Sequence, residues 1–131
     1  KLCFSGKYDE RTLLRKLIGG SGLTGYLGTN SLKEIESRIE QGDAKAKFYL
    51  EAMAYQIAKE IGAMSTVLKG DIDAIILTGG GAKCKLLMDM IIDRVKFIAP
   101  IKIYPGEHEM LALAQAALRV LRGEENPKEY S

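Results

Sequence analysis

Residues 73–95, DAIILTGGGAKCKLLMDMIIDRV, decide the fold of this chain. The apolar run that ends at Leu77 predicts a strand over residues 73–77, of the kind buried in parallel sheets. Three glycines follow, and residues 83–95 then place apolar side chains at helical spacing. A second strand is expected over residues 101–104. Strand, glycine turn, helix and strand together form one right-handed βαβ unit, which predicts the α/β class.

The rest of the chain is predicted to be mainly helical. The spacing of apolar residues predicts further helices over residues 9–18, 31–40, 44–68 and 107–121. Asn30 or Ser31 is expected to cap the second of these helices, and the glycine-rich segment 19–30 before it is expected to be a loop. The helix over 44–68 has apolar side chains around more than one face, so we expect it to be buried on more than one side. Residues 123–131 form a polar tail.

Two strands are too few for a free-standing parallel sheet. The chain also begins with Lys1 rather than methionine. We therefore expect the remaining strands to come from residues outside this chain or from another chain, and we expect the chain to be a piece of a larger protein.

Composition and charge exclude several classes of partner. The chain has a net charge of +2 at pH 7, which is too small to imply a nucleic-acid or membrane partner. A helix-turn-helix over residues 13–39 would have a net acidic second helix, which disfavours DNA binding. No apolar run is long enough to span a membrane. Cys3 and Cys84 lie far apart in the sequence and are expected to be free thiols in a reducing cytoplasm.

The glycine turn after Leu77 is compatible with two interpretations. Backbone N–H groups at the start of a helix attract anions, and glycines let a phosphate approach the backbone closely. The P-loop pattern is absent, and the third glycine of the dinucleotide-binding pattern is replaced by Cys84. The residues alone therefore leave nucleotide binding and a plain turn equally open.

Two further groups of residues have a functional and a structural interpretation. Cys84 lies between Lys83 and Lys85 near a helix start, a position that can lower the pKa of a thiol. No histidine or acid is placed to activate it, so an inert thiol is favoured. Glu107 and Glu109 lie at the start of the last helix, where acids complement the helix dipole or hold Mg²⁺.

Several blocks of the sequence, in this order, resemble the butyrate kinases of the acetate kinase group, within the actin/sugar-kinase superfamily. The most specific blocks are GGSGLTGYLGTN, EIESRIEQGDAKAKFYLEAMAYQIAKEIGAMSTVLKGDIDAIILTGG and IYPGEHEMLALAQAALRVL. The resemblance implies a partial actin-like (ribonuclease H-like) kinase domain in which the βαβ unit and several helices pack together. It also implies that residues 1–131 are the C-terminal part of the second, nucleotide-binding domain of a two-domain acyl kinase.

The resemblance implies that ATP or ADP, with Mg²⁺, binds near two segments of this chain. The residues implied in nucleotide binding are Ser31, Leu32, Lys33, Gly79, Gly80, Gly81 and Ala82. Glu107 is implied as the magnesium-linked carboxylate, with Glu109 as the alternative. The family usually has an aspartate and an arginine where this chain has Ser31 and Lys33, and lysine lacks the planar fork of arginine.

The family's catalytic residues belong to segments that precede everything in this chain. The resemblance therefore implies that a short-chain carboxylate binds through the absent part, that this chain contains no catalytic residue, and that the parent is a homo-oligomer. The chain alone is expected to be inactive. Two alternatives remain open: an acetate or propionate kinase of the same group, and a non-catalytic actin-like module that binds nucleotide or a partner protein.

Overall fold

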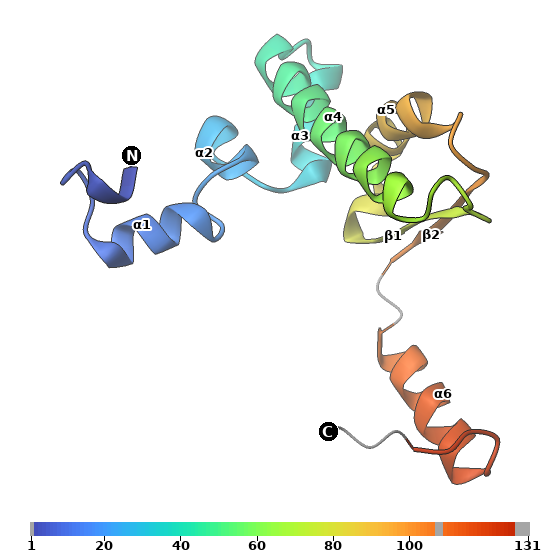
Figure 1. The fold of residues 1–131 in the computed structure, drawn as a ribbon. Coiled ribbons are helices and arrows are strands. Elements are labelled where there is room, and N and C mark those ends of the chain that lie inside the picture. Colours follow the sequence, from blue (N-terminus) through green and yellow to red (C-terminus); the bar gives the residue numbers. More distant parts are fainter. Residues whose placement is uncertain (1, 107–108, 128–131) are drawn as a thin grey trace.

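The computed structural model describes residues 2–106 and 109–127. Figure 1 shows a central body, from which the segments that contain α1 and α6 project at the two ends of the chain. The elements, in chain order, are a 3-10 turn η1 (Leu2–Phe4), α1 (Glu10–Leu17), α2 (Leu23–Leu27), α3 (Leu32–Glu40), α4 (Ala44–Val67), β1 (Ile75–Gly79), a 3-10 turn η2 (Gly80–Lys83), α5 (Lys85–Val95), β2 (Ile101–Pro105) and α6 (Glu109–Leu121).

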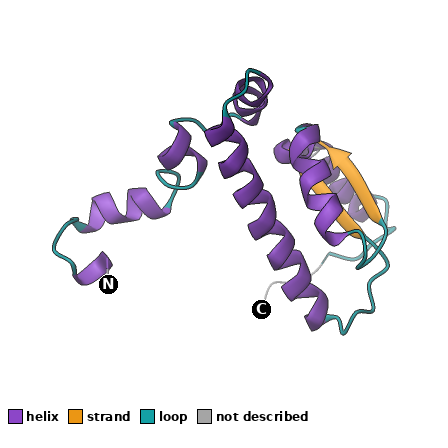
Figure 2. Cartoon of the chain, turned by 90° about the horizontal axis from the view of Figure 1, so that it is seen from above, coloured by secondary structure: helices purple, strands orange, loops and turns teal. Residues whose placement is uncertain are grey.

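The predicted βαβ unit and the α/β class are confirmed. Strands β1 and β2 pair in parallel, with Ile75 opposite Ile101 and Gly79 opposite Pro105. Helix α5 connects them and covers one face of the pair, with α4 beside it (Figure 2). The first strand begins two residues later than predicted, because pairing begins where the Ile75 N–H donates to the Pro100 carbonyl at 2.8 Å.

The core of the body lies where α4 packs against α5. The buried residues of α4 recur every fourth position and form one narrow stripe: Ala46, Leu50, Ala54 and Ala58. The buried residues of α5 are Leu87, Met88, Ile91 and Val95. Three of the four positions on α4 are alanines, which lets the two helices approach closely, and each fully buried leucine or isoleucine contributes roughly 1.5–3 kcal/mol.

The expectation that α4 is buried on more than one side is wrong for the part of the chain that the structure describes. Phe48 is 63% exposed and Met64 is 57% exposed, outside the buried stripe. An apolar groove follows these side chains, in two hollows of about 570 and 510 Å³ that share Gln56 and Ile57. The apolar side chains are present as the pattern indicated, but the buried ones form a single stripe on one face of the helix.

The glycine-rich segment 19–30 was expected to be a loop, but it contains helix α2. The helix begins after Gly22 and ends at Gly28, which adopts the left-handed conformation with φ 78°. Leu23 packs against the core, and the ring of Tyr26 stacks on that of Tyr49 in α4 with 4.2 Å between centroids. These contacts override the low helix propensity of the glycines around them.

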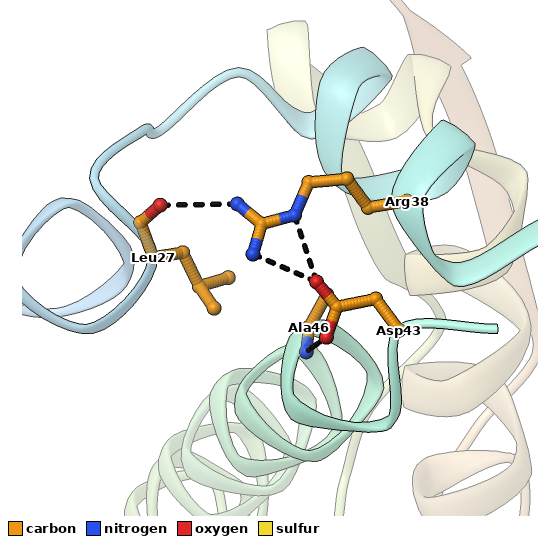
Figure 3. A network of polar contacts seen from close by, with 4 residues as sticks. All are labelled: Leu27, Arg38, Asp43 and Ala46. Atoms are coloured by element: carbon orange, nitrogen blue, oxygen red, sulfur yellow. Dashed lines mark hydrogen bonds and ion pairs between the residues drawn. The ribbon is translucent and has the colours of Figure 1, made fainter. Parts of the chain in front are cut away.

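One ion pair connects the ends of three helices (Figure 3). The Arg38 guanidinium donates to Asp43 Oδ2 from Nε at 2.9 Å and from Nη2 at 2.7 Å, and to the Leu27 carbonyl from Nη1 at 3.0 Å. The other Asp43 oxygen accepts the Ala46 N–H at 2.9 Å and thereby caps α4. Arg38 therefore holds the end of α2 and the turn between α3 and α4 together.

The projecting helices α1 and α6 do not contribute to the core. Asp9 accepts the Thr12 N–H at 2.7 Å at the start of α1, and neither α1 nor α6 has a buried residue. The predicted start of the last helix at residue 107 lies outside the described residues. Residues 123–127, the described part of the predicted polar tail, are exposed.

We expect Asp43 to make the stability of the chain depend on acid pH. The bond from the Ala46 N–H and the Arg38 guanidinium lower the pKa of Asp43 below its ordinary value. The charged Asp43 carboxylate therefore stabilises the folded chain fully above its pKa in the unfolded state, near 4. This stabilisation is lost as pH falls through the lower pKa of Asp43 in the folded state. Asp43→Asn keeps a capping side chain but loses the charge, so its melting temperature should lie below that of the wild type at pH 7 and approach it by about pH 2.

Thermal unfolding followed by circular dichroism between pH 2 and pH 7 measures this difference. Asp71→Asn is the matched control, because Asp71 is exposed and its side chain makes no ion pair with any described residue. A constant gap between wild type and Asp43→Asn across the whole pH range would contradict the prediction.

Candidate functional site

The glycine turn begins where β1 ends. Gly79 has a φ of 82°, which favours glycine, and its carbonyl accepts the Gly106 N–H at 3.1 Å. The turn η2 follows, so α5 begins at Lys85 rather than at residue 83 as predicted. Gly79 is therefore needed for the turn itself, and Gly80 and Gly81 lie beyond it, at the carboxyl end of the strand, where open α/β sheets bind ligands.

The start of α3 faces this turn. Ser31 caps the helix, since its Oγ accepts the Glu34 N–H at 3.4 Å. The Thr29 hydroxyl donates to the Glu34 carboxylate at 2.8 Å and fixes the same corner. A Cβ atom on Gly81 would lie 3.9 Å from the Leu32 Cδ1 atom, so the two segments lie close to each other.

A pocket of about 510 Å³ lies between the two segments, which are far apart in the sequence. Its lining residues are Asn30, Leu32, Lys33, Glu36, Gly80, Gly81, Lys83 and Cys84. Four of the seven residues predicted to bind nucleotide are thus brought together: Leu32, Lys33, Gly80 and Gly81.

The other three predicted residues have structural positions and do not line the pocket. Gly79 belongs to the strand pair, Ala82 is only 6% exposed, and the Ser31 side chain caps α3. Whether any of the three touches a ligand stays a prediction.

Sequence reasoning missed four pocket residues: Asn30, Glu36, Lys83 and Cys84. Glu36 lies one helical turn beyond Leu32 and Lys33, so the spacing of α3 was a signal that could have found it. Lys83 was visible as the first charged residue after the glycines. The two lysines and an exposed Gly80 suit an anionic ligand, and the Leu32 side chain offers an apolar surface beside them.

Cys84 is an inert thiol, as the sequence favoured. It is 3% exposed, and its Sγ accepts the Leu87 N–H at 3.4 Å. Burial, with the nearby Glu36 carboxylate, raises its pKa to about 11. The suggestion that Lys83 and Lys85 lower this pKa is wrong, because loss of water around the thiol outweighs the charge of exposed lysines.

The predicted magnesium ligand cannot be placed. Glu107 lies outside the described residues, and Glu109, the alternative, is exposed at the first position of α6. The described ranges 2–106 and 109–127 contain no group of three or more His, Cys, Asp or Glu side chains arranged to hold a metal ion. They also contain no helix long and apolar enough to cross a membrane.

The parallel βαβ unit has a pocket at the carboxyl end of its first strand, which is where open α/β sheets bind ligands. Residues 8–117 match the model of the Acetokinase family, and the chain belongs to this family. The chain is also 58% identical, over 130 residues, to "Probable butyrate kinase 2" of Caldanaerobacter subterraneus subsp. tengcongensis. That match covers 99% of this chain and 37% of the relative, so the chain spans little more than a third of the relative's length. The expected resemblance to the acetate kinase group is confirmed.

The two thiols should differ strongly in reactivity. Cys3 is exposed and Cys84 is buried, and neither forms a disulfide. With a pKa of about 11, the thiolate fraction of Cys84 at pH 8 is on the order of one in a thousand. Iodoacetamide should therefore label Cys3 first, and the rate at Cys84 should rise steadily as pH increases toward 11.

Peptide mass spectrometry of timed samples measures both rates, and Cys3→Ser serves as the control that isolates Cys84. The raised pKa also means that the stabilising effect of the neutral thiol is complete below pH 9 and is lost as pH rises from about 9 to 11. Labelling of Cys84 at pH 8 as fast as that of Cys3 would contradict the account.

Proposed function

We propose that the chain is the C-terminal part of the second, nucleotide-binding domain of a butyrate kinase-like enzyme with an actin-like fold. This enzyme transfers phosphate between ATP and a short-chain carboxylate, and it forms an acyl phosphate and ADP. The proposal is supported by membership of the acetokinase family and by the 58% identity to a probable butyrate kinase. A cytoplasmic enzyme fits the two free thiols, and we expect it to be a homo-oligomer.

The observation that carries the proposal is the meeting of Leu32 and Lys33 with Gly80 and Gly81 around one pocket. The resemblance implied both pairs as nucleotide contacts, and the fold brings them together although they belong to different elements. A nucleotide has an apolar base and an anionic phosphate chain. The pocket offers a matching combination of Leu32 with the ammonium groups of Lys33 and Lys83.

These residues bind and orient a nucleotide in the proposed enzyme. Phosphoryl transfer depends mainly on positioning and on neutralisation of charge around the transferred group. Lys33 and Lys83 supply positive charge on this side of the nucleotide, whereas the carboxylate and the remaining charges bind through the absent part. Mg²⁺, when bound, neutralises phosphate charge, and the described residues do not assemble a site for it.

The alternative within the family is an acetate or propionate kinase, because the acid is bound outside this chain. A non-catalytic actin-like module is the alternative from another class. It is favoured by Ser31, where the family usually has aspartate, since the Ser31 side chain caps α3 and does not line the pocket.

Calorimetric titration with Mg-ADP tests the nucleotide site. Gly81→Val places two methyl groups at the pocket wall, next to Leu32. We expect the wild type to bind and Gly81→Val to lose at least tenfold in affinity, equivalent to about 1.4 kcal/mol.

Gly62→Val is the matched control, because a Cβ at Gly62 in α4 meets no atom within 4 Å and Gly62 does not line this pocket. Equal binding by all three proteins would place the nucleotide elsewhere. No binding by the wild type would contradict a site formed by this chain alone.

A second test concerns catalysis by the 131-residue chain. We expect no measurable formation of butyryl phosphate from ATP and butyrate, because the family's catalytic residues precede this segment. A coupled assay of ADP release measures the rate, and Gly81→Val purified in the same way reports contaminating kinase. A robust rate in the wild type that Gly81→Val abolishes would refute the claim that the chain contains no catalytic residue.

A further inference from the structure

Glu36 on α3 connects the two walls of the pocket by hydrogen bonding to the start of α5, where the Cys84 side chain is one of its partners. The Leu86 N–H, at the second position of α5, donates to Glu36 Oε1 at 3.3 Å. This N–H is one of the first four of the helix, which have no partner within the helix itself. Glu36 therefore satisfies a free donor on the opposite element, fifty positions along the chain.

Glu36 is well placed to control the pocket. It is half-buried, lines the pocket, and lies on the same side of α3 as Leu32 and Lys33. The Leu86 N–H that donates to Glu36 belongs to the other wall, because Leu86 lies two residues beyond Cys84, which lines the pocket. A change in this bond would thus move the α3 wall relative to the glycine wall.

The charges around Glu36 indicate that the hydrogen bond, rather than an ion pair, is its structural contribution. The nearest lysine on α5, Lys85, is paired with Asp89 one turn further on. Neither Lys33 nor Lys83 forms an ion pair with any described residue. A carboxylate at the start of α5 also complements the helix dipole.

We propose that Glu36 is a positioning residue, which sets the separation of Lys33 from Gly80 and Gly81 by holding the start of α5 against α3. This inference rests on the proposed nucleotide site. Glu36 acts through the Leu86 N–H and the two walls, and its role requires an acceptor oxygen at Oε1 rather than a negative charge.

Three variants test the proposal. Glu36→Gln keeps an acceptor oxygen, Glu36→Ala removes it, and Glu40→Ala removes an exposed acid on the same helix that makes no hydrogen bond with a described residue. In Mg-ADP titrations we expect Glu36→Gln to bind within about twofold of the wild type. Glu36→Ala should lose about tenfold, and Glu40→Ala should not change. Rescue by the amide separates positioning from a general effect of altering α3.

A second readout does not depend on nucleotide. Hydrogen exchange of the Leu86 amide, followed by NMR, should be slow in the wild type and in Glu36→Gln, and faster in Glu36→Ala. If the wild type fails to bind Mg-ADP, the proposed nucleotide site is refuted, and the exchange rates alone decide whether Glu36 holds the two walls. Unchanged exchange in Glu36→Ala, or weak nucleotide binding by both Glu36 variants, would overturn the proposal.

Discussion

The packing of α5 against one stripe of α4 is the contact on which the rest of the structure depends. A parallel pair of strands needs a crossover, and this crossover is held in place by the small residues Ala46, Ala54 and Ala58, with Leu50 among them. The position of α5 in turn fixes where the glycine turn lies. The Arg38–Asp43 ion pair joins the turn between α3 and α4 to the end of α2. The position of α3, which forms the other wall of the pocket, is therefore also fixed relative to α4.

A second constraint is the amount of apolar surface left uncovered. Ile76 is 61% exposed and Tyr104 is 53% exposed on the strands, and the outer groove of α4 is apolar along most of its length. A sheet of two strands does not bury enough surface to explain these side chains. Together with the share of the relative that the chain covers, they support the proposal that further strands and a second domain complete the enzyme.

The sequence predicted local structure well and tertiary surroundings poorly. The βαβ unit, a cap at Asn30 or Ser31 (Ser31 in the structure) and the long helix that begins at Ala44 followed from spacing and capping chemistry within the segments themselves. Helix α2 was missed because the glycine content of this segment indicated a loop. The helix is stabilised by contacts that Leu23 and Tyr26 make with residues distant in the sequence. The same limit applies to the pocket: the glycines were evident and helical spacing could have indicated Glu36, but the bond of Glu36 to α5 joins segments fifty positions apart, which periodicity does not report.

The proposed function depends on a nucleotide that binds between the start of α3 and the glycine turn. An NMR titration of the isotopically labelled chain with Mg-ADP tests it most directly, because each wall reports separately. We expect the amide signals of Lys33, Gly80 and Gly81 to shift together with one saturating dependence on Mg-ADP, whereas those of α6 should not shift. Shifts confined to the outer groove of α4, or to one wall alone, would contradict it.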